Sequence, residues 1–247
     1  MKKAGHIFIT IALSASVSLS AFAVDYNSLS VKASRFYQYD EWASALAMYQ
    51  LMLDKRPDDA DTYCHAIVAA SMEKMQEEPM RLLEQSLNAR VPLDSIYNGV
   101  RRLAFEQGDA QLYVQFLENV GKRFPWMQRN IDARLLEYYT WRRDGRGMVE
   151  YAGRMLQGMP DNINFLTSLA DGYFALGLDR EAVDAYTKVI ALNPHNYHAL
   201  LVLGNYYENV SRQDRFNDEA RVLARQYLER AQAIHPTPHV ATLLAGL

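Results

Sequence analysis

Two pairs of histidines have the spacing that a metal site could use. His195 and His198 are three residues apart, and His235 and His239 are four apart. A zinc site needs three or four protein ligands, and neither pair has a nearby cysteine or a further histidine. Both pairs also fall where we expect turns between helices. The sequence therefore predicts no metal site and no cofactor.

The single cysteine, Cys64, is the next candidate for chemistry. It allows no disulfide within the chain, and it lies among Ala60, Ile67 and Val68 at helical spacing. A cysteine nucleophile would need a partnered histidine, and His65 points to a different side of the helix because it is the next residue. We therefore expect a buried thiol. The chain also has no glycine-rich phosphate loop and no G-x-S-x-G motif, so we predict no enzymatic activity.

One cluster of charge could bind an anion or an acidic partner. Arg142, Arg143 and Arg146 surround Asp144 in a segment where a turn is expected. The alternative is an ordinary exposed turn, which we favour. Elsewhere the carboxylates are scattered over polar helix faces, and no strong basic stripe is present, so nucleic acid is not an expected partner.

The first 23 residues have the composition of a secretory signal peptide. Lys2 and Lys3 form a basic start, residues 7–17 are mostly apolar, and Ala21-Phe22-Ala23 offers a cleavage site. A retained N-terminal anchor is the alternative. Cleavage after Ala23 leaves 224 residues with 24 basic and 29 acidic side chains. We expect an exported, periplasmic protein that does not insert into a membrane after signal cleavage.

The elements that would position any site are set by a regular series of prolines. A proline lacks an N–H group and disfavours helix in the residue before it, so each one is a plausible helix end. Six of the eight prolines fall at intervals of 33 to 35 residues, except the last interval, which is 42. A period of this length indicates a repeated structural unit. The six are Pro57, Pro92, Pro125, Pro160, Pro194 and Pro236.

The residues between the prolines carry a motif. The fifth unit reads Leu166-x2-Leu169-Ala170-x2-Tyr173, then Gly177, then Ala182-x3-Tyr186, then Pro194. The sixth reads Leu200-x2-Leu203-Gly204-x2-Tyr207, then Ala224-x3-Leu228, then Pro236, and the first reads Ala33-x2-Phe36, then Ala45-x3-Tyr49, then Pro57. This pattern resembles the tetratricopeptide repeat (TPR), strongly in these three units and moderately in the central three, which have Met80, Tyr113 and Met148 where alanine is expected.

The resemblance implies an all-α fold, a right-handed α-α superhelix of about six helix pairs with a short C-terminal cap at 237–247. The expected units are 26–59, 60–93, 94–127, 128–162, 163–196 and 197–236. Asp179 is expected to cap the second helix of the fifth unit. The sixth unit has eight extra residues between Glu208 and Arg221, which predict a lengthened helical hairpin or a tolerated surface insertion.

In the TPR family the first helix of each pair usually lines a concave binding surface. Counting back from the prolines gives three columns of residues on these helices. The column 30 residues back holds Asn27, Thr62, Ser95, Asn130 and Asn164, with His198 equivalent, and we interpret it chiefly as helix caps. The other two columns lie 20 and 23 residues before the prolines, with Asn205 the equivalent position in the longer sixth unit. Together with Trp141 beside them, they give the candidate partner-binding residues: Tyr37, Arg102, Phe105, Glu137, Trp141, Asp171, Phe174 and Asn205.

The family's carboxylate clamp is not expected here, because Leu201 occupies the position of its lysine one turn before Asn205. The resemblance implies a non-catalytic scaffold or adaptor in the bacterial cell envelope that binds a protein or peptide partner. Two alternatives stay open. One is a structural subunit of an envelope assembly that uses its convex face or the 208–221 hairpin. The other is an accessory subunit that presents substrate to a separate enzyme.

Overall fold

The computed structural model describes residues 25–214 and 216–247, and within these it contains helices and no strand. The expected signal peptide lies outside the described residues. The chain forms two compact units, one ending at Ala110 and the other beginning at Gln111. The prediction of an all-α helical repeat fold is confirmed by the helices themselves.

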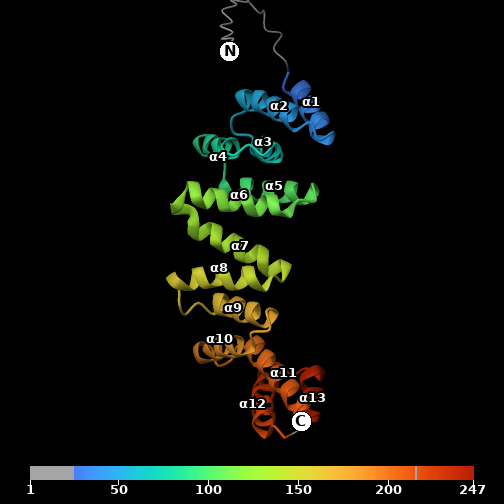
Figure 1. Cartoon of the computed structure of the whole chain (residues 1–247), viewed down its shortest axis with the longest axis vertical. Helices are drawn as coiled ribbons and strands as arrows, with labels where there is room; N and C mark the ends of the chain where they lie inside the picture. Colours follow the sequence, from blue (N-terminus) through green and yellow to red (C-terminus); the bar gives the residue numbers. More distant parts are fainter. Residues whose placement is uncertain (1–24, 215) are drawn as a thin grey trace, which may run out of the picture. The chain divides into compact units, whose positions relative to one another are not determined.

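The first unit holds five helices, coloured blue to green in Figure 1. Neighbouring helices pack on each other, α1 on α2, α2 on α3, and α3 on both α4 and α5. Their bounds are α1 Tyr26–Gln38, α2 Trp42–Lys55, α3 Ala60–Met72, α4 Glu78–Asn88 and α5 Leu93–Glu106.

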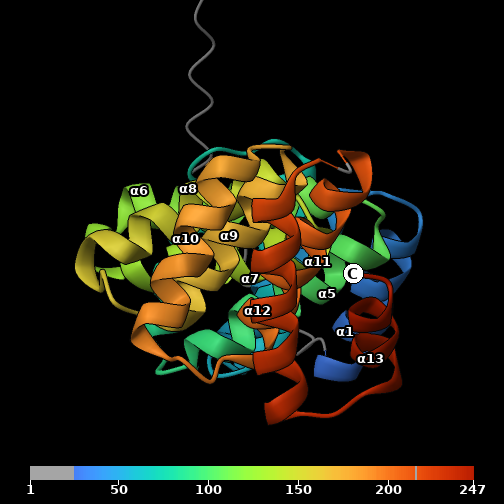
Figure 2. The same ribbon diagram turned by 90° about the horizontal axis from the view of Figure 1, so that it is seen from below.

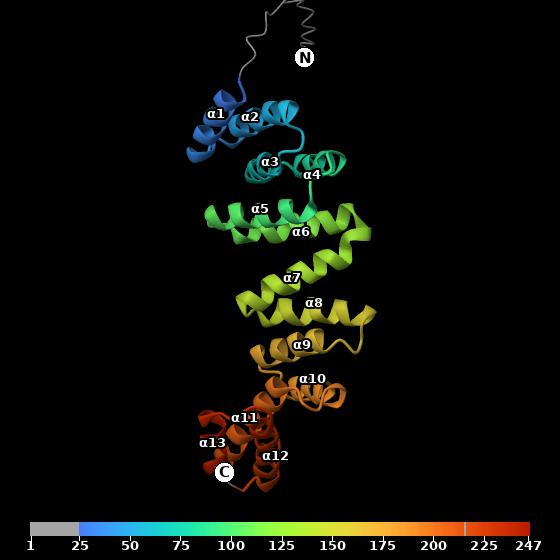
Figure 3. The ribbon, with the colours of Figure 1, turned by 180° about the vertical axis from the view of Figure 1, so that it is seen from behind.

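The second unit begins one residue into α6 and ends with α13 (Figure 3). Here α7 packs on α8, α8 on α9, α9 on α10, α10 on α11 and α11 on α12. The bounds are α6 Ala110–Arg123, the 3₁₀ turn η1 Pro125–Met127, α7 Gln128–Arg142, α8 Gly145–Gly158, α9 Ile163–Ala175, α10 Asp179–Leu192, α11 Tyr197–Gln213, α12 Asp218–Ile234 and α13 Pro238–Ala245.

The six prolines lie between helices, as expected of helix ends. Each second helix of a pair stops two to four residues before its proline. Pro125 itself opens η1, and Pro92 is the residue that precedes α5. The proline therefore follows a helix that has already ended and fixes the turn into the next pair.

The residues that cap these helices differ from the sequence expectation. Asp59 caps α3 by accepting hydrogen bonds from the backbone N–H groups of Asp61 and Thr62, so Thr62 is not the cap. Asn162 caps α9 in the same way, in place of Asn164, and Asn196 caps α11. Each of these three caps stands two residues after a proline.

The rest of the expected cap column is also wrong. The side chains that precede α1, α5 and α7 make no cap hydrogen bond, and none of the expected residues Asn27, Ser95 and Asn130 occupies the cap position. Asp179 is the first residue of α10, which begins without a side-chain cap after Leu178. A capping side chain must sit on a residue that is not yet helical, and these residues lie inside their helices.

The alanine column of the motif forms the close contact between paired helices. Ala45, Ala182 and Ala224 are fully buried, and the three larger residues that replace alanine are buried as well. These replacements are Met80, Tyr113 and Met148, each at most 5% exposed. The column is therefore an interior position in all six pairs, and the central pairs fill it with larger side chains.

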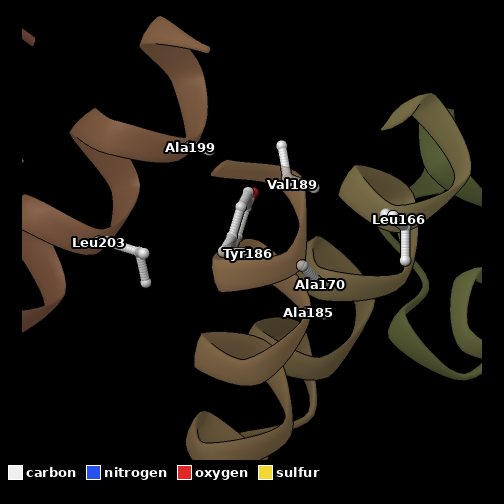
Figure 4. Packing of buried hydrophobic residues seen from close by; sticks show 7 residues of the cluster. All are labelled: Leu166, Ala170, Ala185, Tyr186, Val189, Ala199 and Leu203. Carbon is white, nitrogen blue, oxygen red and sulfur yellow. The ribbon is translucent and has the colours of Figure 1, made fainter. Parts of the chain in front are cut away.

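The core of the second unit is continuous across α9, α10 and α11. Tyr186 and Val189 of α10 are fully buried between Ala170 of α9 and Leu203 of α11 (Figure 4). Burying one such side chain contributes about 1.5–3 kcal/mol. Position 204, which follows Leu203, needs glycine because a Cβ atom there would stand 2.6 Å from Leu228 Cδ2 of α12. The turn between α9 and α10 needs Gly177, whose φ is 72°.

The extra residues of the sixth unit lengthen its helices. α11 and α12 have 17 residues each, whereas the other α-helices before them have 11 to 15. Phe216, in the turn between them, is 93% exposed. The short helix α13 packs on α12 and α11, and its Val240 is fully buried; α12 and α13 are the red helices in Figure 2.

Candidate protein-binding surfaces

In the first unit, the first helices of neighbouring pairs meet through aromatic rings. Tyr37 of α1 packs edge-on against His65 of α3, with ring centroids 5.1 Å apart. Tyr49 of α2 lies 5.3 Å from the same His65 ring, and Trp42 lies 5.0 Å from Tyr37. Tyr37 is 9% exposed, and burial raises its pKa to about 12. Tyr37 is therefore a packing residue at the base of this surface.

Charged side chains stand beside these rings. Arg102 of α5 donates hydrogen bonds to Asp61 of α3 at 3.0 Å and to Glu106 at 3.1 Å. The Asp61 side chain is 69% exposed and the Arg102 side chain 50% exposed. His65 Nδ1 lies 3.4 Å from the other oxygen of Asp61. We call the residues Tyr37, Asp61, His65, Arg102 and Glu106 the α1–α3–α5 surface.

A second set of side chains joins α9, α10 and α11 in the other unit. The hydroxyl of Tyr186 donates a hydrogen bond to Asp171 and lies 3.0 Å from Nε2 of His198. Nε2 of His198 is 3.7 Å from Oδ1 of Asp171. The neighbouring Asp171 raises the pKa of His198 above its usual value, while burial and Asp171 together raise that of Tyr186.

Aromatic rings extend this arrangement along α9 and α11. Phe174 lies 5.9 Å from Tyr186 and 5.5 Å from Tyr206, measured between ring centroids. Asn205, one residue before Tyr206, is half-buried. We call Asp171, Phe174, His198, Asn205 and Tyr206 the α9–α11 surface. It combines a partly exposed acid–imidazole pair with a row of rings.

The structure places five of the eight candidate residues in these two sets. Tyr37 and Arg102 belong to the first, and Asp171, Phe174 and Asn205 to the second. Phe105 is half-buried near the end of α5. Glu137 and Trp141 are exposed on α7, where Trp141 is 66% exposed. Trp126 is also exposed, but it lies at the other end of α7, about 22 Å away for 15 helical residues.

Three residues of the two surfaces were not predicted from the sequence: His65, His198 and Tyr206. His65 was considered only as a possible partner for Cys64 and was set aside. His198 was interpreted as a cap equivalent, although its ring contacts Asp171. Tyr206 neighbours the motif residue Tyr207 and lies one position from Asn205. The available signal was an adjacent pair of tyrosines, of which Tyr207 stacks on Tyr227 and Tyr206 lies against Phe174.

The other residues considered for chemistry, Cys64 and the arginine cluster around Asp144, have structural roles. Cys64 is 2% exposed, and burial raises its pKa to about 12, so the thiolate is scarce. Asp144, within the arginine cluster, caps α8 by accepting from the N–H groups of Arg146 and Gly147. Among residues 25–214 and 216–247 no group of three His, Cys, Asp or Glu side chains could hold a metal ion. No helix in these ranges is long and apolar enough to span a membrane.

Comparison with known proteins gives similarity in solved structures only. No protein family model and no curated protein sequence matches the chain. The C-terminal part of a TPR repeat-containing protein from Cytophaga hutchinsonii is 14% identical, with 85% of this chain and 79% of that chain covered and a TM-score of 0.47. A protein from Bacteroides ovatus described as a putative protein binding protein is 18% identical, covers 63% and 95%, and has a TM-score of 0.46.

A third similar structure is the TPR2AB domain of yeast Sti1 in its pHSP90 complex. It is 14% identical, with 89% of this chain and 97% of that chain covered and a TM-score of 0.38. Scores and identities at this level assign no partner. The two surfaces therefore have to be judged from their own side chains.

Proposed function

We propose that this chain is a non-catalytic scaffold that binds a segment of a partner protein on the first helices of its pairs. The observation that carries the proposal is the α9–α11 surface, where Asp171, His198 and Asn205 stand beside the rings of Phe174 and Tyr206. Hydrogen-bonding groups next to half-buried aromatic rings suit a peptide, because aromatic residues concentrate binding energy and polar groups fix register.

The α1–α3–α5 surface supports the same function in the other unit. Its exposed charges, Asp61, Arg102 and Glu106, alternate in sign and stand beside the packed rings of Tyr37 and His65. Charges held in this way discriminate among partners more than they add affinity. A partner segment with both acidic and basic side chains is therefore the kind that this surface would select.

Photocrosslinking tests which helices meet the partner. A photoreactive benzoylphenylalanine replaces Asp61 or His198 on the two surfaces, and Arg81 or Lys188 as controls on the second helices α4 and α10. All four positions are well exposed. After irradiation in the producing cell, we expect the same crosslinked partner from Asp61 or His198 and none from the controls. Partner capture only from Arg81 or Lys188 would contradict the proposal.

We infer a place in the cell envelope from the basic start, apolar run and Ala21-Phe22-Ala23 of the N-terminus. Cell fractionation with N-terminal sequencing tests it. The expected result is a periplasmic chain that begins at Val24. A cytoplasmic chain that begins at Met1 would contradict it.

One observation favours a second function, that of a structural subunit acting through the α11–α12 hairpin. Phe216 in its turn is 93% exposed, and Val222 on α12 is 65% exposed. Large apolar side chains so exposed are common at protein interfaces. If the hairpin carries assembly, Phe216→Ala abolishes complex formation while His198→Ala preserves it. The scaffold function predicts the reverse.

A further inference from the structure

The outward side of the first helix pair is an open apolar hollow. It measures about 670 Å³ and is lined by Lys32, Arg35, Phe36, Tyr39, Glu41 and Met48. Tyr39 is 69% exposed, and Val31 one turn before Arg35 is 70% exposed. Met48 of α2 borders the hollow together with the α1 residues, while the rest of α2 packs on α1 and α3. We call these six lining residues the first-pair edge.

The last helix pair is covered by a further helix, whereas no described helix covers the first-pair edge. At the C-terminal end α13 packs on α12 and α11 and buries Val240 completely. At the first-pair edge, Phe36 and Met48 stay half-buried with no described helix over them. In stacked helical repeats each pair buries its apolar face only against a neighbour, so an uncapped end offers a surface for one more element.

The charges around the hollow indicate what that element is. Lys32 and Arg35 stand on α1, and Glu41 stands in the turn between α1 and α2. Among the described residues none of these three side chains forms an ion pair or a hydrogen bond. An apolar centre with cations on one side and an anion on the other is complementary to itself after a two-fold rotation. Arg35 of one copy then faces Glu41 of the other, twice.

We propose that the first-pair edge is a self-association surface at which two copies of this chain form a symmetric dimer. Phe36, Tyr39 and Met48 of each copy fill the hollow of the other, and the cations at positions 32 and 35 pair with the carboxylate of Glu41. The face of α1 and α2 measures only about 20 Å by 20 Å, from 13 to 14 residues at 1.5 Å rise and about 10 Å per helix. An interface of this size is at the low end, so the dimer is expected in the micromolar range.

Sedimentation velocity of the purified chain between about 1 and 200 μM measures the dimerisation constant. Arg35→Glu places two carboxylates opposite each other at both symmetric positions, and Glu41→Arg does the same with two cations. Each single variant is expected to weaken the dimer about tenfold or more, equivalent to about 1.4 kcal/mol. The double variant, Arg35→Glu with Glu41→Arg, restores it because the exchanged charges pair again.

Controls separate this proposal from general charge effects and from misfolding. Lys188→Glu changes an exposed cation on α10 and is expected to leave dimerisation unchanged. Circular dichroism checks that each variant keeps its helices, which the exposure of Arg35 and Glu41 favours. A wild-type chain that stays monomeric at 200 μM overturns the proposal. So does a dimer that resists both single variants, or a double variant no better than either one.

Discussion

At the scale of single residues, the hydroxyl of the buried Tyr186 holds the partly exposed Asp171 and His198 side chains together. Tyr186 is fully buried, yet its hydroxyl reaches the edge of the core and donates to Asp171. The fixed carboxylate then lies 3.7 Å from the His198 imidazole and favours its protonated form. The candidate surface on α9 and α11 is therefore tied directly to the core beneath it.

This arrangement predicts a histidine titration. We expect NMR to show the pKa of His198 above its usual value of about 6.5 in the wild type and closer to that value in Asp171→Asn. Because the pKa is raised in the folded state, the pair stabilises the fold below the unfolded pKa. That stabilisation is lost as pH rises through the folded pKa. An unchanged titration in Asp171→Asn would mean that Asp171 does not set the His198 pKa.

Two glycines that look alike in sequence should respond oppositely to alanine. In Gly204→Ala the new Cβ would lie 2.6 Å from the buried side chain of Leu228, and overpacking of this kind costs about 1–3 kcal/mol. In Gly153→Ala nothing lies within 4 Å of the new atom in the middle of α8, and the variant is expected to gain about 0.5–1 kcal/mol. Thermal unfolding of both variants is the measurement. Equal shifts of the same sign would contradict the packing argument.

At the scale of elements, the helix starts give a test of two asparagines two residues apart. Asn162 Oδ1 accepts from the N–H groups of Asn164 and Phe165 at 3.0 and 3.2 Å. Removing this cap in Asn162→Ala is expected to cost about 0.5–2 kcal/mol. Asn164→Ala should change stability by less than about 0.5 kcal/mol, as exposed substitutions usually do. Urea unfolding distinguishes them, and a larger loss in Asn164→Ala would reverse our assignment of the cap.

The helix pairs could be predicted from the sequence, but the capping residues could not. The prolines and the alanine column predicted the helix pairs, since both act through chain geometry that a spacing reveals. Caps depend on which residue first takes helical dihedral angles, and the stretch around the start of α3 offers Asp58, Asp59, Asp61 and Thr62 within five positions. All four can cap, so composition does not choose among them.

The candidate surfaces divide in a similar way. Counting back from the prolines found Asp171 and Phe174 because both stand on the first helix of a well-defined unit. It did not predict that Tyr186, on the second helix, contacts Asp171, or that His198 lies against the same carboxylate. Such contacts join three helices, and only their packing brings the side chains together.

At the scale of the whole molecule, the two compact units suggest that stability is local. In a chain of stacked pairs each element contacts its neighbours, so stability approximates a sum of local terms. Leu53→Ala, at a residue 1% exposed in α2, should cost about 2–5 kcal/mol. Hydrogen exchange by mass spectrometry is expected to speed up in α1–α4 and to stay unchanged in α9–α12. Leu228→Ala is the matched variant for the other unit, and a uniform increase in either case would show a single cooperative fold.

The labelling rate of the Cys64 thiol can measure local opening of the first unit. Cys64 Sγ packs against Gly99 of α5, where an added Cβ would stand 2.3 Å from the sulfur. A thiol reagent reaches this atom only when α3 and α5 separate. The labelling rate of unmodified protein should therefore track how often these helices part. A partner or second copy that steadies the first unit should slow that reaction, and one that binds only the other unit should leave it alone.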